Sequence, residues 1–154
     1  IVIMVEQKLK IYCDTNIYSR PFDQITHPRI HLEATACLKI FNLTCNNRID
    51  ILSSDILKYE IEHISLDRQL LTKPLLQLCK IHIPQSLRIK NLAELLLKEI
   101  KLAPRDSLHL ASAIIGRADF FLTCDDEIIH KIKNLSMKNK IIIINPVEFL
   151  YHYL

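Results

Sequence analysis

Short apolar runs alternate with longer helical segments along this chain, and this alternation limits the possible folds more than any other feature. The runs that read as strands cover residues 8–13, 49–52, 81–83, 120–123 and 141–144. Between them, apolar residues recur at helical spacing. Strands that alternate with helices are typical of a parallel sheet with helices on both faces. We therefore predict one doubly wound α/β domain over residues 1–154, with about five strands in the sheet.

The composition excludes several classes of protein. The chain has 154 residues, of which 49% are hydrophobic and 24% charged, and these values indicate a globular protein rather than a disordered one. The single glycine rules out a glycine-rich loop for a dinucleotide or a P-loop phosphate site. The net charge of +3 is ordinary for a domain of this size and is weak evidence for a polyanionic partner.

The cysteines and the first residues bear on the compartment. There are five cysteines, an odd number with no C-x-x-C pair, so a reducing cytoplasm is a better interpretation than a disulfide framework or a zinc site. No apolar run reaches membrane-spanning length, and we expect no membrane association. The opening residues 1–5 are too few for a signal-peptide core. Met4 is a candidate for the natural start.

Local signals predict the ends of the helices. Pro28 opens a helix that ends near Asn46 and Asn47, and a loop with Pro21 and Asp23 precedes it. One helix is expected to begin at residue 55, and a further helix to end at about residue 80. Other helices are expected over residues 91–102, from residue 104, and after residue 145. Gly116 is expected to end the helix that Pro104 opens, in a conformation with positive φ.

Four acids occupy comparable places in this pattern. Asp14 follows the first predicted strand, and Asp125 follows the fourth. Asp106 lies in the first turn of a helix that runs antiparallel to the strands, so it faces their carboxyl ends. Glu60 lies on an otherwise apolar helical row, where an acid is unfavourable without a function, and Glu62 is the alternative acid on that helix. Ligands bind outside the carboxyl ends of strands in such sheets, so we expect the four carboxylates to converge there.

A divalent cation would make such a cluster stable. Like charges at short range cannot all stay ionised, and Mg²⁺ or Mn²⁺ takes carboxylate oxygens as ligands. One or two such ions activate a water and stabilise the leaving oxygen of a phosphodiester. The pattern therefore predicts metal-dependent phosphoryl chemistry, most simply that of a nuclease. Each acid also has a structural interpretation, as a cap or a helix-dipole residue.

The sequence resembles the PIN-domain nucleases, most closely the small prokaryotic toxins of VapBC-type toxin–antitoxin modules. The resemblance rests on C-D-T-N at 13–16, S-x5-E at 54–60, R-D-S-L-H-L-A-S-A at 105–113, T-C-D-D at 123–126 and I-I-N-P-V-E-F-L at 143–150. Each motif alone is weak, but together they cover nearly the whole chain in the right order. The stretch between residues 66 and 91 matches no motif.

The resemblance implies a metal-dependent endoribonuclease with a five-stranded parallel sheet. Asp14, Glu60, Asp106 and Asp125 would then surround Mg²⁺ or Mn²⁺. Asn16 would be an auxiliary polar group, Thr123 would orient the end of the fourth strand, and Asp126 would share or replace the role of Asp125. The implied partners are an RNA substrate and an antitoxin protein. We also expect a homodimer, because leucines at 92 and 95–97 cover more than one stripe of their helix; an antitoxin segment or the domain itself would cover them equally well.

Other polar residues have structural interpretations that we favour over functional ones. His109 and His63 are expected to be hydrogen-bonded structural histidines. Cys13 and Cys124 adjoin two of the acids but are expected on the opposite face of the strands, as core thiols. Basic residues that are candidates for phosphate contacts, although each is more often a solvated charge, are Arg20, Arg29, Arg105, Lys131, Lys133, Lys138 and Lys140.

Two other functions compete with the nuclease. A receiver-like or phosphatase phosphotransfer domain would use a similar sheet, but the phosphatase pattern needs an Asp two residues after Asp14, where Asn16 stands. A receiver usually has an adjacent acid pair after its first strand, and here only Asp14 is present. A catalytically inactive PIN-like domain that binds RNA or a protein is the third hypothesis. The intact acidic quartet disfavours it.

Overall fold

The structure is a computed structural model that describes residues 7–133 and 141–153. Its strands are β1 (Leu9–Cys13), β2 (Ile49–Ser54), β3 (Ile81–Ile83), β4 (Phe120–Leu122) and β5 (Ile142–Ile144). Its helices are α1 (Thr15–Ser19), the 3₁₀ helix η1 (Arg20–Phe22), α2 (Pro28–Cys45), α3 (Asp55–Glu62), α4 (Leu66–Leu76), α5 (Leu87–Ile100), α6 (Pro104–Ile115), α7 (Asp126–Lys133) and α8 (Pro146–Tyr153).

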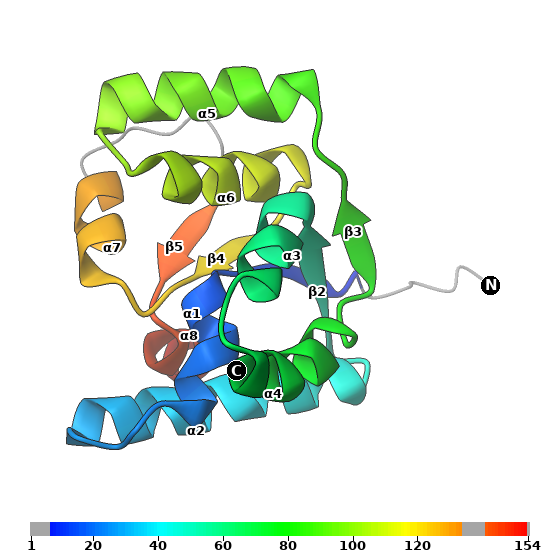
Figure 1. Cartoon of the computed structure of the whole chain (residues 1–154), viewed down its shortest axis with the longest axis vertical. Helices are drawn as coiled ribbons and strands as arrows, with labels where there is room; N and C mark the ends of the chain where they lie inside the picture. The colour runs from blue at the N-terminus through cyan, green and yellow to red at the C-terminus, as the bar shows by residue number, and fades with distance from the viewer. Residues whose placement is uncertain (1–6, 134–140, 154) are drawn as a thin grey trace.

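All five strands pair in parallel, in the order β3-β2-β1-β4-β5 (Figure 1). This arrangement confirms the predicted parallel sheet and the number of strands. β1 lies at the centre, with Cys13 opposite Leu122 of β4 and Tyr12 opposite Leu52 of β2. Strand residues point alternately to the two sides of the sheet, so each strand contributes to two separate cores.

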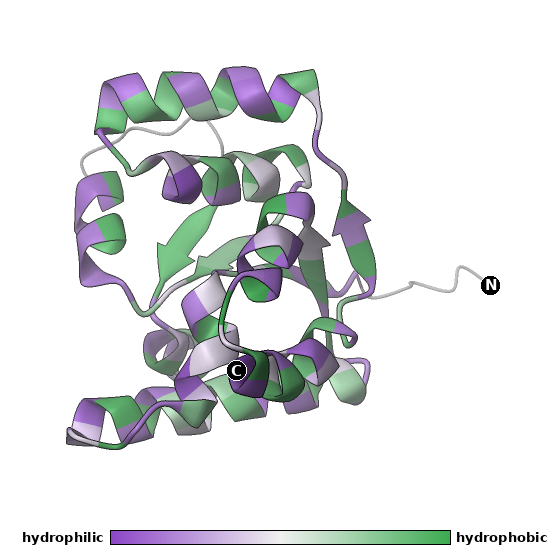
Figure 2. Cartoon of the chain, viewed as in Figure 1, coloured by the Kyte–Doolittle hydropathy of each residue, from purple (hydrophilic) through white to green (hydrophobic). Residues whose placement is uncertain are grey.

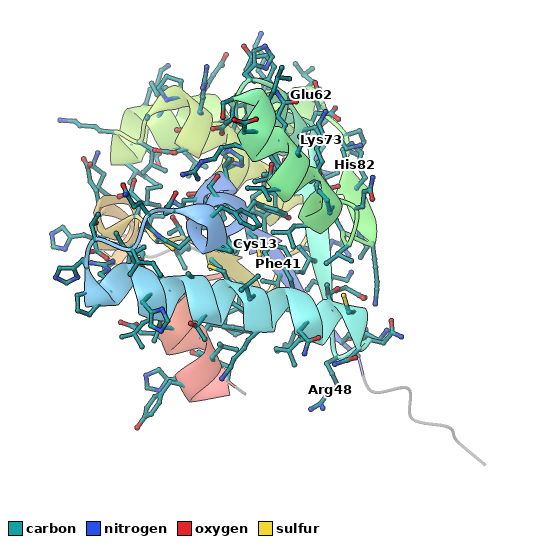
Figure 3. All side chains as sticks on the ribbon, turned by 60° about the horizontal axis from the view of Figure 1, so that its bottom comes forward. Cys13, Phe41, Arg48, Glu62, Lys73 and His82 are labelled. Atoms are coloured by element: carbon teal, nitrogen blue, oxygen red, sulfur yellow. The ribbon has the colours of Figure 1, made fainter. Side chains whose placement is uncertain are left out.

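Helices cover both faces of the sheet, as predicted. One core contains Ile11 and Cys13 of β1 together with residues of α1, α2, α3 and α8. The other contains Tyr12, which lies between Ile11 and Cys13 in β1, together with residues of α5, α6 and α7. Cys13 and Phe41 point into the interior beside α2, whereas Glu62 lies on the outside (Figure 3). The hydropathy colouring shows the strands β4 and β5 as hydrophobic and α5 as a helix of mixed faces (Figure 2).

Several helix signals act as the sequence indicates. Ser54 caps α3 by accepting a hydrogen bond from the backbone of Leu57, and Asn145 accepts one from Val147 at the start of α8. Asn47, after α2, has a φ of 57°. Within the described residues, no helix combines the length and the apolar character that a membrane crossing requires.

Some local predictions were wrong. The segment after Asp14 is not a loop: the Asp14 side chain accepts a hydrogen bond from the Thr15 backbone and caps α1. α5 begins at Leu87, four residues earlier than predicted, because Ser86 caps it. The apolar run 142–144 forms the edge strand β5, where Ile142 is 40% exposed.

Gly116 follows the last residue of α6, as predicted, but the positive φ predicted for it was wrong. Its φ is −74°, so the residue with the left-handed conformation after α6 is Arg117, at 58°. A Cβ at Gly116 would lie 2.9 Å from Cγ1 of Ile83 and 3.1 Å from Cδ2 of Leu52. The glycine is therefore needed for the close approach of α6 to β2 and β3, rather than for a special backbone conformation.

Candidate metal and active site

The strand order places the switch point of the sheet between β1 and β4. The chain leaves β1 towards β2 on one side and leaves β4 towards β5 on the other, so the connections diverge at this point (Figure 1). Ligands of doubly wound sheets bind at such a switch point, outside the carboxyl ends of the strands. Asp14 follows β1 here, and its backbone N–H donates to the carbonyl of Leu122, at 2.9 Å. The first predicted acid therefore lies at the expected position.

Asp14 is a buried carboxylate that neighbouring groups orient. Its Oδ1 accepts a hydrogen bond from the backbone of Thr15, at 2.8 Å. Its Oδ2 accepts one from the Thr123 hydroxyl, at 2.8 Å, and one from the Asn16 amide, at 3.2 Å. Burial raises the pKa of Asp14, while His109 and these hydrogen bonds act in the opposite direction. The carboxylate is thus fixed in position at some electrostatic cost.

Asn16 and Thr123 connect the ends of β1 and β4. The Asn16 amide donates to Oγ1 of Thr123, at 3.1 Å, and its oxygen accepts from the backbone of Cys124, at 3.0 Å. Oγ1 of Thr123 also accepts from the backbone of Asp125, at 3.1 Å. The two side chains therefore hold Asp14 and the segment leading to Asp125 in one network.

Glu60 approaches from α3 and is held by His109. Nε2 of His109 contacts Oε1 of Glu60 in a short hydrogen bond. Burial opposes ionisation of Glu60, but the hydrogen bond from His109 and the charge of Arg105 outweigh it and lower the pKa of the carboxyl. Arg105 lies over the ring of Tyr59, 5.7 Å from its centroid. Glu62 is exposed at the end of α3 and does not join this group.

Asp106 stands in the first turn of α6, as predicted, and its environment is strongly acidic. Burial, together with the carboxylates of Asp14, Asp125 and Glu60, raises its pKa to about 6, while His109 acts in the opposite direction. A helix N-terminus would by itself favour the charged form. The carboxylates of the quartet therefore lie close enough to Asp106 to repel its negative charge.

Asp125 and Asp126 have different environments in the structure. Asp125 precedes α7, where its Oδ1 accepts from the backbone of Glu127, at 2.9 Å. Asp126 is exposed and forms two hydrogen bonds with Arg29, at 2.5 and 2.6 Å, and this pairing lowers its pKa. Asp125 thus stays beside the acidic cluster, whereas Asp126 pairs with a basic residue of α2.

The donor set of the cluster suits a hard divalent cation, because it consists of carboxylate and amide oxygens. Burial is the main cause of the raised pKa values at Asp14 and Asp106, and neighbouring carboxylates add to it, so a bound cation would favour the ionised forms of both acids. Within residues 7–133 and 141–153, no three His, Cys, Asp or Glu side chains are arranged as a ready ligand group.

His109 is hydrogen-bonded, as expected, but its closeness to two of the acids was not predicted. Its ring is 1% exposed and lies 4.0 Å from Oδ1 of Asp14, in addition to its contact with Glu60. The spacing from Asp106 was an available signal, because residues three apart share a helical face. His63, by contrast, is exposed and bonds to the Tyr59 carbonyl. Cys13 and Cys124 are buried in the core, as expected.

Three of the candidate phosphate-binding residues pair with acids of the protein. Arg20 pairs with Asp23 and Glu33, and Arg29 pairs with Glu33 and Asp126. Lys131 pairs with Glu127. Arg105 is the basic candidate whose charge acts on an acid of the quartet. Lys138 and Lys140 lie outside the described residues.

Comparison with known proteins identifies a structural neighbour. No protein-family profile matches the chain, and no curated protein sequence matches it. The fold is similar to a chain in the crystal structure of VapBC2 from Rickettsia felis bound to a DNA fragment from their promoter. The TM-score is 0.61 at 18% identity, over 89% of this chain and 98% of that chain. This likeness shows that the two chains share their fold, in accord with the predicted doubly wound α/β architecture.

Proposed function

We propose that the protein is a metal-dependent endoribonuclease and the toxin of a toxin–antitoxin pair. Asp14, Glu60, Asp106 and Asp125 would hold Mg²⁺ or Mn²⁺, with Asn16 as an auxiliary group. The observation that carries the proposal is the placement of two acids: Asp14 is buried at the end of β1 and held by Thr123 and Asn16, and Glu60 is held beside it by His109. The raised pKa of Asp106 agrees with this arrangement. Perturbed titrating groups gathered in a crevice are typical of functional sites.

The bound cation would supply an activated water and neutralise charge at the leaving oxygen of a phosphodiester. The chain's own residues orient the acids for this task. Thr123 and Asn16 hold Asp14, and His109 holds Glu60. Arg105 is exposed beside this group and is the basic side chain best placed to contact a phosphate. No residue acts as a covalent nucleophile in the proposed reaction.

The partner and the compartment are further parts of the proposal. The structural neighbour comes from a crystal structure of VapBC2, and we propose that this chain likewise binds an antitoxin protein. Leu95 and Leu97 of α5 are 49% and 39% exposed, a surface suited to a second copy of the chain or to that partner. The five cysteines are free, in accord with a reducing cytoplasm.

The test is cleavage of RNA by the purified protein, with Mn²⁺ or Mg²⁺ and with a chelator added. We expect the chelator to abolish cleavage, and Asp14→Asn or Asp106→Asn to lower it by at least about 100-fold while the circular dichroism spectrum is kept. Glu62→Gln is the matched control, because Glu62 is an exposed acid on the same helix as Glu60. Full activity of Asp14→Asn or Asp106→Asn would refute the proposal. Single-stranded DNA of the same sequence tests the choice of RNA.

The competing functions make different predictions. The strand order β3-β2-β1-β4-β5 differs from the 2-1-3-4-5 order of receiver domains, which argues against a receiver-like module. A catalytically inactive domain would bind neither Mg²⁺ nor Mn²⁺ in a calorimetric titration. Metal binding without cleavage of either nucleic acid would favour a binding function instead.

A further inference from the structure

Three flat side chains lie together where α3 and α6 meet, next to the candidate metal site. Tyr59 lies in α3 and His63 directly follows that helix, and their rings stack with centroids 4.1 Å apart and planes at 30°. Arg105 of α6 places its guanidinium over the Tyr59 ring, 5.7 Å from the centroid. Nδ1 of His63 donates a hydrogen bond to the Tyr59 carbonyl, at 2.7 Å, and this bond fixes the orientation of the imidazole.

The three side chains are open to solvent. Tyr59 is 45% exposed, and His63 and Arg105 are exposed as well. Carbon atoms in direct contact lie about 3.5 to 4 Å apart, so the guanidinium covers the Tyr59 ring only loosely. In the part of the chain that the structure describes, Arg105 forms no ion pair with an acid. The group therefore presents aromatic surface and a positive charge to a ligand.

The group borders two acids of the candidate metal site. Tyr59 directly precedes Glu60, and Arg105 directly precedes Asp106. The charge of Arg105 contributes to the lowered pKa of Glu60, so the guanidinium lies near that carboxylate. An acidic cluster repels a polyanion at short range. A ligand that carries phosphate therefore gains from a cation and an uncharged stacking surface at the border of the cluster.

The chemistry of the group fits an unpaired nucleobase. Bases of single-stranded RNA stack on aromatic rings and on guanidinium planes, whereas bases within a duplex are covered by their neighbours. We propose that Tyr59, His63 and Arg105 form a binding site for one unpaired nucleobase of RNA and its phosphate. The base stacks on the aromatic pair, and Arg105 contacts the phosphate. That this RNA is also the substrate rests on the proposed function; the binding of an unpaired base does not.

The experiment compares two RNA probes by fluorescence anisotropy, in the Asp14→Asn background with Mg²⁺ so that the probes stay intact. One probe is a short fluorescein-labelled single strand of mixed sequence, and the other is the same strand annealed to its complement. Tyr59→Leu removes the ring, and Tyr59→Phe keeps it. We expect Tyr59→Leu to weaken single-strand binding by about 10-fold and Tyr59→Phe by less than about 3-fold. Duplex binding should change by less than about 3-fold in both variants, because no base face is available there.

Two further variants separate stacking from charge. Tyr151→Leu is the matched control, because Tyr151 of α8 is an exposed tyrosine whose ring lies beside that of His152, and it should keep single-strand affinity within about 3-fold of its parent. Arg105→Gln removes the charge. The slope of log affinity against log salt concentration should then become shallower by about 0.7, the value for one phosphate contact of a single strand. Tyr59→Leu should keep the slope of its parent.

Three results would overturn the site: equal single-strand affinities of Tyr59→Leu and Tyr59→Phe, equal losses by Tyr59→Leu for single strand and duplex, or no detectable binding of the single strand. Equal losses for both probes are the result expected if Tyr59 serves only to pack α3 against α6. Thermal unfolding of each variant confirms that the chain is folded before its affinity is interpreted.

Failures of the two proposals are distinguishable. If the wild type cleaves RNA with Mn²⁺ but Tyr59→Leu binds the single strand as tightly as Tyr59→Phe, the base site is refuted and the ribonuclease stands. If the wild type cleaves no RNA but Tyr59→Leu selectively loses single-strand affinity, the ribonuclease is refuted and the base site stands.

Discussion

Thr123 donates its hydroxyl to Oδ2 of Asp14 at 2.8 Å, although the two residues are 109 positions apart in the chain. The contact joins the end of β4 to the end of β1, and both residues are buried. The same Oγ1 accepts hydrogen bonds from Asn16 and from the backbone of Asp125. A single hydroxyl thus coordinates the positions of two proposed metal-binding acids.

Replacement of this hydroxyl should disturb Asp14 more than the fold. Thr123→Val keeps the shape of the side chain but leaves Asp14 and the Asp125 N–H with one partner fewer. We expect a loss of stability of about 1 to 3 kcal/mol and a reduction of Mn²⁺ affinity of about 10-fold. Thr123→Ser, which restores the hydroxyl, should recover most of the affinity. Equal affinities for the Val and Ser variants would show that the hydroxyl does not orient the site.

The pKa of Asp106 leads to a prediction about stability and pH. Burial and neighbouring carboxylates raise that pKa to about 6 in the folded protein, from an ordinary value of 3.8. An acid with a raised folded-state pKa stabilises the fold below its unfolded pKa, and this stabilisation is lost as the pH rises through the folded pKa. The metal-free protein should therefore lose stability between about pH 4 and pH 6.5 because of Asp106.

Asp106→Asn removes that cost. A shift of this size corresponds to about 3 kcal/mol, which partial solvent exposure of Asp106 reduces to about 1 to 2 kcal/mol. The metal-free variant should therefore unfold about 4 °C higher than wild type at pH 7.5, and at the same temperature as wild type near pH 4. Thermal unfolding across this pH range measures the difference. A variant that is no more stable than wild type at pH 7.5 would contradict the conclusion that the ionised form of Asp106 destabilises the metal-free protein.

Gly116 offers a test of packing that is independent of function. Its φ of −74° is one that alanine adopts freely, so the backbone conformation allows alanine there. The added Cβ would meet Ile83 and Leu52 within 3.1 Å, so we expect Gly116→Ala to destabilise the protein by about 1 to 3 kcal/mol.

Urea unfolding measures this effect, and Ile83→Val supplies the matched background. Removal of Cδ1 from Ile83 takes away the atom nearest to the new methyl group. The cost of Gly116→Ala should therefore be smaller in Ile83→Val than in wild type, a coupling that a double-mutant cycle isolates. If the two costs are equal, Ile83 does not limit the residue at 116.

The sequence predicted the features that depend on local patterns. The apolar residues of runs such as Ile49–Leu52 indicate a strand, and the alternation of these runs with helices indicates a parallel sheet. Asp14 and Asp106 were predicted beside one edge because both positions are defined by the ends of secondary-structure elements. Helix caps at Ser54 and Asn145 follow equally local rules.

Features that depend on tertiary contacts were not predictable in this way. The local sequence does not show whether Gly116 is needed for a left-handed cap or for a close contact. The position of Ile83 in β3, beside Gly116, shows that the close contact requires it. The partners of His109 come from β1 and α3, 97 and 49 positions away. The sequence likewise did not indicate which of the adjacent acids Asp125 and Asp126 lies beside the other acids. The ion pair between Arg29 of α2 and Asp126 distinguishes them in the structure.

Those adjacent acids lead to the last prediction. Asp125 affects the electrostatics of Asp106, whereas Asp126 is 66% exposed and paired with Arg29. Asp125→Asn should therefore lower metal-dependent RNA cleavage by at least about 100-fold and weaken Mn²⁺ binding, as expected for a proposed ligand. Asp126→Asn should change cleavage by less than about 3-fold, because an exposed ion pair contributes at most about 1 kcal/mol. Cleavage assays on the two variants at matched protein and Mn²⁺ concentrations compare the acids directly. The reverse order of effects would assign the fourth position of the site to Asp126 and would require Arg29 to release it when the cation binds.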